Sequence, residues 1–118
     1  MKKISVVVPM YYEEEVAEEC YKRIDDVFKK IKKYELEIIF VDDGSKDKTL
    51  AIIEKIANKD NRVKAISFSR NFGHQAAVQA GLKYTTGDAI VIIDADLQDP
   101  PELIEKMIEL WEKGNDVI

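Results

Sequence analysis

The sequence predicts an α/β protein with a Rossmann-like parallel sheet and helices on both faces of that sheet. Short runs rich in β-branched residues alternate along the chain with longer segments in which apolar residues recur every three or four positions. Strands joined by helices of ten or more residues form right-handed crossovers, and such crossovers produce a parallel sheet covered on both faces. No linker, internal repeat or low-complexity tract interrupts the pattern, so residues 1–118 are expected to belong to one domain.

The expected strands and helices alternate from the N-terminus onward. Strands buried on both faces are expected at residues 4–8, 37–41, 63–68 and 89–93, and a fifth is expected to begin at residue 116. Helices are expected at residues 13–33, between a cap at Ser45 or Asp47 and the polar loop 58–62, at 73–84, and from Pro100 to Gly114. Each helix carries an apolar stripe that can pack against the sheet.

The composition is that of a globular protein, and it narrows the classes of function. The 18 basic and 23 acidic residues give a net charge of −5, which argues against a broad nucleic-acid-binding face. The single cysteine, Cys20, excludes an internal disulfide, fits a reducing compartment and is expected in the core. No apolar stretch approaches the roughly 20 residues of a membrane span, so the chain is expected to be soluble and cytoplasmic.

Residues able to do chemistry gather where the expected strands end. In open parallel sheets, ligands bind beyond the carboxyl ends of the strands. The least ordinary segments of this sequence follow those ends, at residues 9–14, 42–45, 70–74 and 94–98. The sequence therefore predicts a ligand site at this edge of the sheet.

Two carboxylates, those of Asp94 and Asp96, lie in the turn that follows the most hydrophobic expected strand. Neighbouring acids repel each other, so the arrangement favours a bound cation, and carboxylates with water and phosphate are the usual ligands of Mg²⁺ or Mn²⁺. Gln98 could add a neutral oxygen ligand. Taken alone, so short an acidic pattern is more typical of a solvated turn before a helix, with Asp99 as the N-cap.

The other strand ends offer groups that could contact a nucleotide. A carboxylate at 42–43 could accept a hydrogen bond from a base, Gly44 lets the backbone approach closely, and Tyr11 could stack on a base. Arg70 stands just before a helix N-terminus, where free N–H groups attract anions. Each of these residues also has a structural interpretation as a turn, capping or space-filling residue, and His74 is more typical of an exposed helix start than of a phosphate contact.

Four motifs occur in a fixed order at these strand ends. They read VVPMYYEE at residues 7–14, VDDGSKDKT at 41–49, SRNFGH at 69–74 and DADLQDPP at 94–101. Together they resemble the family 2 glycosyltransferases of the GT-A fold, and within that family the branch of dolichol-phosphate mannose synthase and bacterial undecaprenyl-phosphate glycosyltransferases. The resemblance covers essentially the whole chain. It implies that residues 1–118 are the nucleotide-sugar-binding portion of a GT-A domain, truncated at its C-terminus.

The resemblance also implies a role for each motif. The residues that would line the pocket for base and ribose are Pro9, Tyr11, Glu13 and Asp42, and those that would shape the adjoining turn are Asp43 and Ser45. The residues that would lie against the rest of the nucleotide are Arg70, Gly73 and Asp94. The catalytic carboxylates would be Asp94 and Asp96, which with Gln98 would hold Mg²⁺ or Mn²⁺ on the diphosphate. The family usually has Asn where this chain has Tyr12, and a bulky ring there would crowd the loop.

The implied reaction is displacement, with inversion, at the anomeric carbon of a nucleoside-diphosphate sugar, expected to be a UDP-sugar. The expected acceptor is a polyprenyl phosphate, whose ionised oxygen makes a strong general base less necessary. A longer protein of this kind is expected at the cytoplasmic face of the membrane. Residues 1–118 alone are expected to bind donor with little or no transfer, and apolar surface left uncovered would promote association.

Two other classes of function compete with this interpretation. One is a nucleotide-binding module without activity of its own. The other is a phosphoryl-transfer domain. A receiver domain would need an acidic pair directly after the first strand, but this chain has Pro9 and Tyr11 there. A dehalogenase-type phosphatase would need Thr or Val at the position of Gln98. Dinucleotide binding is disfavoured because no GxGxxG or GxxxxGK[ST] motif follows any expected strand.

Overall fold

The structure, a computed structural model, describes residues 2–95 and 103–114. The described strands form one four-stranded sheet in the order β3-β2-β1-β4, in which every neighbouring pair is parallel. The strands are β1 (Lys3–Met10), β2 (Glu35–Asp42), β3 (Val63–Ser67) and β4 (Ala89–Ile92). The predicted parallel sheet is confirmed, and each expected strand lies within two residues of the observed one at either end.

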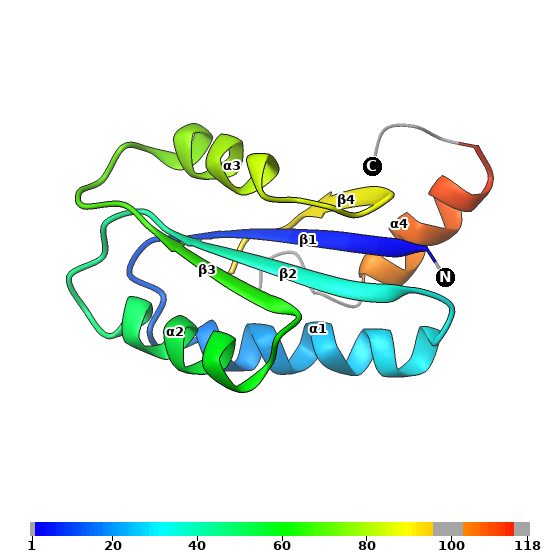
Figure 1. Cartoon of the computed structure of the whole chain (residues 1–118), viewed down its shortest axis with the longest axis horizontal. Helices are drawn as coiled ribbons and strands as arrows, with labels where there is room; N and C mark the ends of the chain where they lie inside the picture. Colours follow the sequence, from blue (N-terminus) through cyan, green and yellow to red (C-terminus); the bar gives the residue numbers. More distant parts are fainter. Residues whose placement is uncertain (1, 96–102, 115–118) are drawn as a thin grey trace.

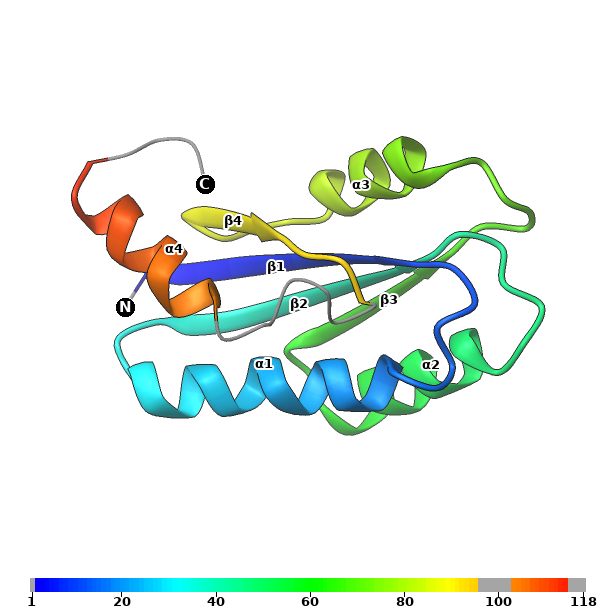
Figure 2. The same cartoon turned by 180° about the vertical axis from the view of Figure 1, so that it is seen from behind.

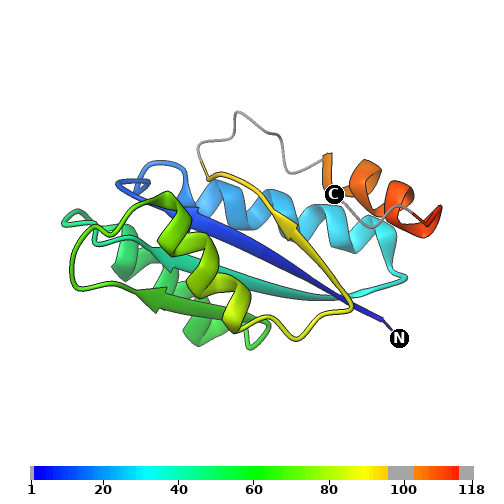
Figure 3. The same cartoon turned by 90° about the horizontal axis from the view of Figure 1, so that it is seen from above.

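Helices cover both faces of the sheet, as predicted (Figure 1). The helices are α1 (Ala17–Ile31), α2 (Thr49–Lys59), α3 (His74–Lys83) and α4 (Leu103–Glu112). In the view from above, α3 crosses one face of the sheet while α1, α2 and α4 lie on the other (Figure 3). The expected cap at Asp99 and the expected fifth strand at residue 116 lie outside the described residues.

Helix α1 begins four residues later than the apolar pattern suggests. The carbonyl of Glu13 accepts hydrogen bonds from the N–H groups of Val16 and Ala17, so residues 13–16 form a turn. The turn carries the chain from the end of β1 into α1. This leaves residues 11–13 as a loop at the carboxyl edge of the sheet, next to the expected ligand site.

The larger hydrophobic core lies between the sheet and the layer formed by α1, α2 and α4. Its members include Cys20, which is fully buried, and burial raises the pKa of its thiol to about 12. The expectation that Cys20 is a core residue is therefore confirmed. On the other face, a β-carbon at Gly81 of α3 would lie 2.5 Å from Cγ1 of Val7, so the small residues of α3 allow it to approach the sheet closely.

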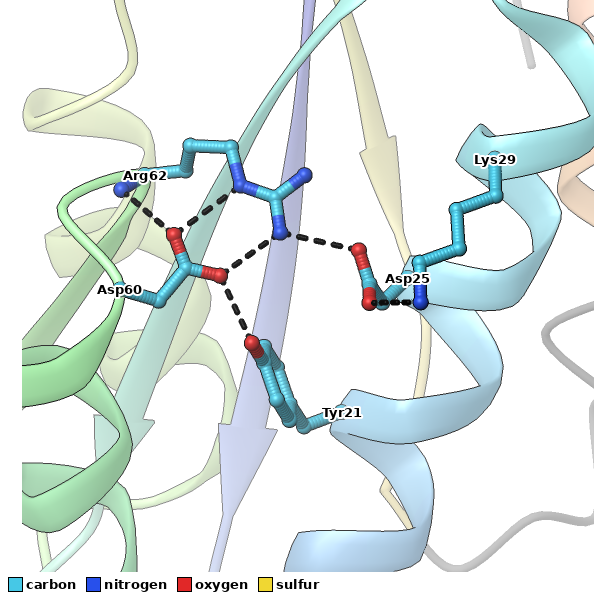
Figure 4. A network of polar contacts seen from close by, with 5 residues as sticks. All are labelled: Tyr21, Asp25, Lys29, Asp60 and Arg62. Atoms are coloured by element: carbon cyan, nitrogen blue, oxygen red, sulfur yellow. Dashed lines mark hydrogen bonds and ion pairs between the residues drawn. The ribbon is translucent and has the colours of Figure 1, made fainter.

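A polar network joins α1 to the connection between α2 and β3 (Figure 4). The hydroxyl of Tyr21 donates a hydrogen bond of 2.7 Å to Asp60, and the guanidinium of Arg62 reaches Asp60 at 2.7 Å and Asp25 at 2.9 Å. Lys29 adds an ion pair of 3.3 Å with Asp25. Hydrogen bonds from Arg62 hold the pKa of Asp60 far below its usual range. Because Arg62 directly precedes β3, this network lies at the amino edge of the sheet, away from the expected site.

A second network surrounds the buried carboxylate of Glu37 on β2. This carboxylate accepts hydrogen bonds from the Ser5 hydroxyl at 2.7 Å and from the Thr86 N–H at 2.8 Å, and it pairs with Lys64 at 3.0 Å. Burial would raise the pKa of Glu37, but these hydrogen bonds outweigh it and lower the pKa to about 2. One side chain thus joins β1, β2, β3 and the turn before β4.

Helix α4 lies near the amino end of β1 (Figure 2). The ring of its Trp111 is 5.8 Å from the ring of Tyr34. Among residues 2–95 and 103–114, no helix combines the length and apolar character needed to cross a membrane. On the face that carries α3, the side chains of Ile90 and Ile92 of β4 are exposed. Association through such apolar surface stays a prediction.

The Glu37 network leads to a test of stability against pH. The folded carboxylate keeps its charge down to about pH 2, whereas in the unfolded chain it takes up a proton near pH 4.3. Its contribution, about 3 kcal/mol, is therefore present above pH 5 and is lost as pH falls toward 2. Because Gln cannot carry that charge, we expect Glu37→Gln to lower the free energy of unfolding by about 3 kcal/mol at pH 7 and to weaken this acid dependence, measured by urea denaturation at pH 7 and pH 3.

Glu35→Gln is the matched control, because Glu35 is an exposed carboxylate on the same strand. It should behave like the unmodified chain at both pH values. An unfolding free energy for Glu37→Gln that equals that of the control at pH 7 would contradict the stabilising role of the network.

Candidate functional site

An open cavity of about 440 Å³ lies at the carboxyl edge of the sheet, and all four segments singled out in the sequence contribute to its wall. The residues expected at a site that line the cavity are Pro9, Tyr11, Glu13, Gly73 and Asp94. Asp42 and Arg70 do not line it. Asp96 and Gln98 lie outside the described residues.

Asp42 and Asp43 are both buried, but only Asp43 lines the cavity. Asp42 closes β2 and is buried, with its Oδ1 accepting the N–H of Ser45 at 3.4 Å. Burial raises the pKa of Asp42, against hydrogen bonds from Ser45 that lower it. Asp43, one residue further, lines the cavity. The wall of the cavity therefore takes its carboxylate from Asp43 at this strand end.

The Asp43 carboxylate binds the backbone of the loop that connects β3 to α3. Its Oδ1 accepts the N–H of Phe72 at 2.8 Å, and its Oδ2 accepts the N–H of Gly73 at 3.0 Å and the side-chain amide of Asn71 at 3.1 Å. The N–H of Asp43 donates to the carbonyl of Met10 at 2.8 Å. Hydrogen bonds to a charged acceptor are the stronger kind, so Asp43 fixes the start of α3 relative to the ends of β1 and β2.

Gly44 lets the same two loops touch. It adopts a left-handed backbone with φ of 79°, and a β-carbon there would lie 2.3 Å from the carbonyl carbon of Arg70. The sequence predicted a close approach at Gly44, and the partner in the structure is the backbone of Arg70. The Arg70 guanidinium lies over the ring of Phe72, 4.8 Å from its centre, rather than in the cavity wall.

The start of α3 meets the end of β4 across the cavity. Gly73, with φ of 102°, precedes the helix and supplies no side-chain cap, so the first-turn N–H groups can attract an anion. Nε2 of His74 lies 3.0 Å from Oδ1 of Asp94. The sequence favours an exposed helix start at His74 and does not indicate this contact. Its position in the first turn beside a strand end was the available signal.

The loop after β1 is held by the segment that leads into α2. The N–H of Tyr12 donates to Oγ of Ser45 at 2.8 Å, and the N–H of Glu13 donates to Oγ1 of Thr49 at 2.9 Å. Asp47 in turn accepts the N–H of Thr49 at 2.9 Å. The N-cap position of α2 is Lys48, so neither expected cap stands there. Asp47 nevertheless bonds to the first helical residue, while Ser45 receives a hydrogen bond from the neighbouring loop.

The donor atoms at the cavity suit a divalent cation only in part. A carboxylate oxygen and an imidazole nitrogen, from Asp94 and His74, lie within 3.0 Å of each other, and both atom types bind Mn²⁺. In the described part of the chain, no cluster of three or more His, Cys, Asp or Glu residues could hold a metal ion. The other two ligands expected from the sequence, Asp96 and Gln98, lie outside that part.

Comparison with known proteins settles the family. Residues 5–118 match the sequence model of the family described as Glycosyl transferase family 2. The chain belongs to this family. The resemblance stated from the four motifs is confirmed, and the phosphoryl-transfer interpretation is set aside.

Curated relatives extend beyond the length of this chain. The chain is 54% identical over 114 residues to the uncharacterized glycosyltransferase YkcC of Bacillus subtilis, covering 97% of this chain and 35% of the relative. It is 50% identical over 116 residues to the bactoprenol glucosyl transferase of Shigella phage SfX, covering 98% of this chain and 38% of the relative. The chain thus spans little more than a third of either relative.

Solved structures show the same fold. The mannosyltransferase PcManGT from Pyrobaculum calidifontis, in complex with GDP-Man and Mn²⁺, has a TM-score of 0.69 and 25% identity over 84% of this chain and 33% of the other. TarS 1-349 from S. aureus, in complex with UDP, has a TM-score of 0.63 and 30% identity over 88% of this chain and 32% of the other. The GT-A fold implied by the motifs is confirmed.

Removing the Asp43 carboxylate should release the loop before α3. We expect Asp43→Ala to lower the free energy of unfolding by about 2 kcal/mol and to speed amide hydrogen exchange at Phe72 and Gly73, measured by NMR. Asp26→Ala removes an exposed carboxylate of α1 and serves as the control for lost charge. Unchanged exchange at Phe72 and Gly73 would contradict the role assigned to Asp43.

Proposed function

We propose that this chain is the donor-binding part of an inverting glycosyltransferase that moves a sugar from a nucleoside-diphosphate sugar to a polyprenyl phosphate. The observation that carries the proposal is the cavity in which Tyr11, the start of α3 and Asp94 come together in a member of family 2. The phage relative, a bactoprenol glucosyl transferase at 50% identity, supports the lipid-linked acceptor. The Pyrobaculum neighbour, in complex with GDP-Man and Mn²⁺, supports the donor class and the use of a divalent ion.

The nucleotide would lie across the cavity from β1 to α3. Its base and ribose would contact Pro9, Tyr11 and Glu13, which follow one another along the wall. Asp42 would support this pocket indirectly, because its carboxylate holds the backbone of Ser45. The Arg70 guanidinium would have to move off the ring of Phe72 to contact the nucleotide.

The diphosphate would lie against the start of α3. The uncapped N–H groups of the first turn, which Gly73 leaves accessible, would donate hydrogen bonds to its oxygens. His74 would hold the carboxylate of Asp94 in one orientation through their 3.0 Å contact. Mg²⁺ or Mn²⁺ held by Asp94, Asp96 and Gln98 would neutralise the charge that develops on the departing diphosphate.

The transfer itself needs little further chemistry from this part of the protein. An oxygen of the acceptor phosphate would form a bond to the anomeric carbon while the bond from that carbon to the diphosphate breaks on the opposite side. The configuration at this carbon is therefore inverted. The acceptor oxygen is ionised at neutral pH, so it does not depend on a strong general base.

A second candidate is donor binding without transfer. It is favoured by the cavity, whose described wall contains residues expected to contact the donor, Pro9, Tyr11 and Asp94 among them. The two candidates share the donor site and differ in turnover. Nucleotide binding by residues 1–118, without transfer from a nucleotide sugar to a polyprenyl phosphate, would support this second candidate.

Calorimetric titration with UDP and with GDP, each with and without Mn²⁺, tests the donor site. We expect UDP to bind in the presence of Mn²⁺ and at least about tenfold more weakly without it, since the ion offsets the charge of the diphosphate. GDP is tested beside it because the two structural neighbours are complexes with GDP-Man and with UDP. The variant Asp94→Asn should lose the dependence on Mn²⁺.

Asp26→Asn, which removes an exposed charge of α1, should bind as the unmodified chain does. The absence of binding of both nucleotides to a chain shown by circular dichroism to be folded would contradict the proposed donor site. Binding that is equally strong without Mn²⁺ would contradict the metal's part in it.

A further inference from the structure

The loop after β1 holds a tyrosine in an unfavourable backbone conformation. Tyr12 has φ of 55°, and among the described non-glycine residues only Lys32 shares a positive value. Lys32 closes α1 as a left-handed C-cap, a position where this conformation is common. Tyr12 has no such explanation, because it lies in a loop between a strand and a helix.

Two hydrogen bonds impose this conformation from outside the loop. Ser45 accepts the N–H of Tyr12, and Thr49 accepts the N–H of the next residue, Glu13. Both acceptors belong to the segment that follows β2, and both donors are backbone N–H groups, so neither bond uses the side chain at position 12. Gly and Asn tolerate a left-handed backbone better than an aromatic residue does. A tyrosine at this position therefore costs stability, and strained residues that persist are found mainly at functional sites.

The ring of Tyr12 does not offset that cost by being buried. Its exposed fraction is 46%, the same as that of Tyr11. What the ring does contact is Tyr11, with ring centres 4.6 Å apart and ring planes at 79°. This edge-to-face arrangement is one that aromatic pairs prefer. Tyr11 lines the cavity and Tyr12 does not, so the ring of Tyr12 contacts the ring of Tyr11 without itself forming part of the cavity wall.

We propose that Tyr12 is a positioning residue that holds the ring of Tyr11 in place as the surface on which the nucleotide base stacks. This inference rests on the proposed function, since it assumes a nucleotide in the cavity. A half-exposed tyrosine loses side-chain freedom when a base stacks on it, and a ring already packed against it reduces that loss. The contact acts on the base end of the ligand alone, because the diphosphate would lie at α3 and Asp94.

The experiment measures three properties of each variant in the intact chain. These are the Kd for UDP with Mn²⁺, the Kd for inorganic pyrophosphate with Mn²⁺, and the Tm. Tyr12→Asn should raise the Tm by roughly 4 °C, because it relieves the backbone strain, and should weaken UDP binding roughly fivefold, because it removes the ring contact. Its affinity for pyrophosphate should equal that of the unmodified chain.

Two further variants separate the ring from the strain. Tyr12→Phe keeps both the ring and the left-handed backbone, so it should restore the affinity for UDP and the original Tm. Tyr84→Asn removes an exposed tyrosine at the end of α3 and should leave the affinity for UDP unchanged.

Each outcome decides the inference. A Tyr12→Asn chain that binds UDP as tightly as the unmodified chain would overturn the positioning role while leaving the proposed function intact. Equal weakening for UDP and pyrophosphate would also overturn it, since a general change in the loop would then explain the loss. Failure of the unmodified chain to bind UDP, GDP or pyrophosphate would instead overturn the proposed function, and this inference with it.

Discussion

The candidate site depends on the carboxylate of Asp43. This group accepts the N–H groups of Phe72 and Gly73, and the N–H of the same residue donates to the carbonyl of Met10. Three parts of the chain that are distant in sequence are thereby joined at one residue: the carboxylate of Asp43 holds the start of α3, and its backbone N–H ties the end of β2 to the end of β1. With the start of α3 fixed in this way, Nε2 of His74 lies 3.0 Å from Oδ1 of Asp94.

The topology of the sheet places that carboxylate where a ligand can use it. In the order β3-β2-β1-β4 the chain first builds outward on one side of β1 and then crosses to the other side through α3. Ligands bind beyond the carboxyl ends of the strands at such a switch point, where the strand order reverses. The cavity takes its wall from the ends of β1, β2 and β4 and from the start of α3, as this topology requires.

Sequence reasoning found the sheet, its helices and the four segments at its carboxyl edge, because strand and helix periodicity and turn residues are local signals. The sequence assigned Asp42 to the pocket and Asp43 to the turn. In the structure Asp43 does hold the adjoining loop through its carboxylate, and it also lines the cavity, whereas Asp42 does not. No local pattern separates the two carboxylates, because both are buried and the partners of Asp43 belong to a loop nearly thirty residues further along the chain. The partners of His74 and Arg70 could not be predicted either, because a sequence motif does not fix the direction in which a long side chain points.

The networks around Arg62 and Glu37 lie together at the amino edge of the sheet, opposite the candidate site. The free energy of local opening therefore need not be the same at the two edges. Segments with few buried contacts open first, while those held by buried hydrogen bonds open only with global unfolding. The exposed loop residues at the carboxyl edge can therefore change without disturbing these networks, provided that Asp43 and Gly44, which hold the same loops together, are kept. A lineage carrying this fold could alter which donor it accepts through successive loop substitutions, each tolerated because the scaffold beneath keeps its shape.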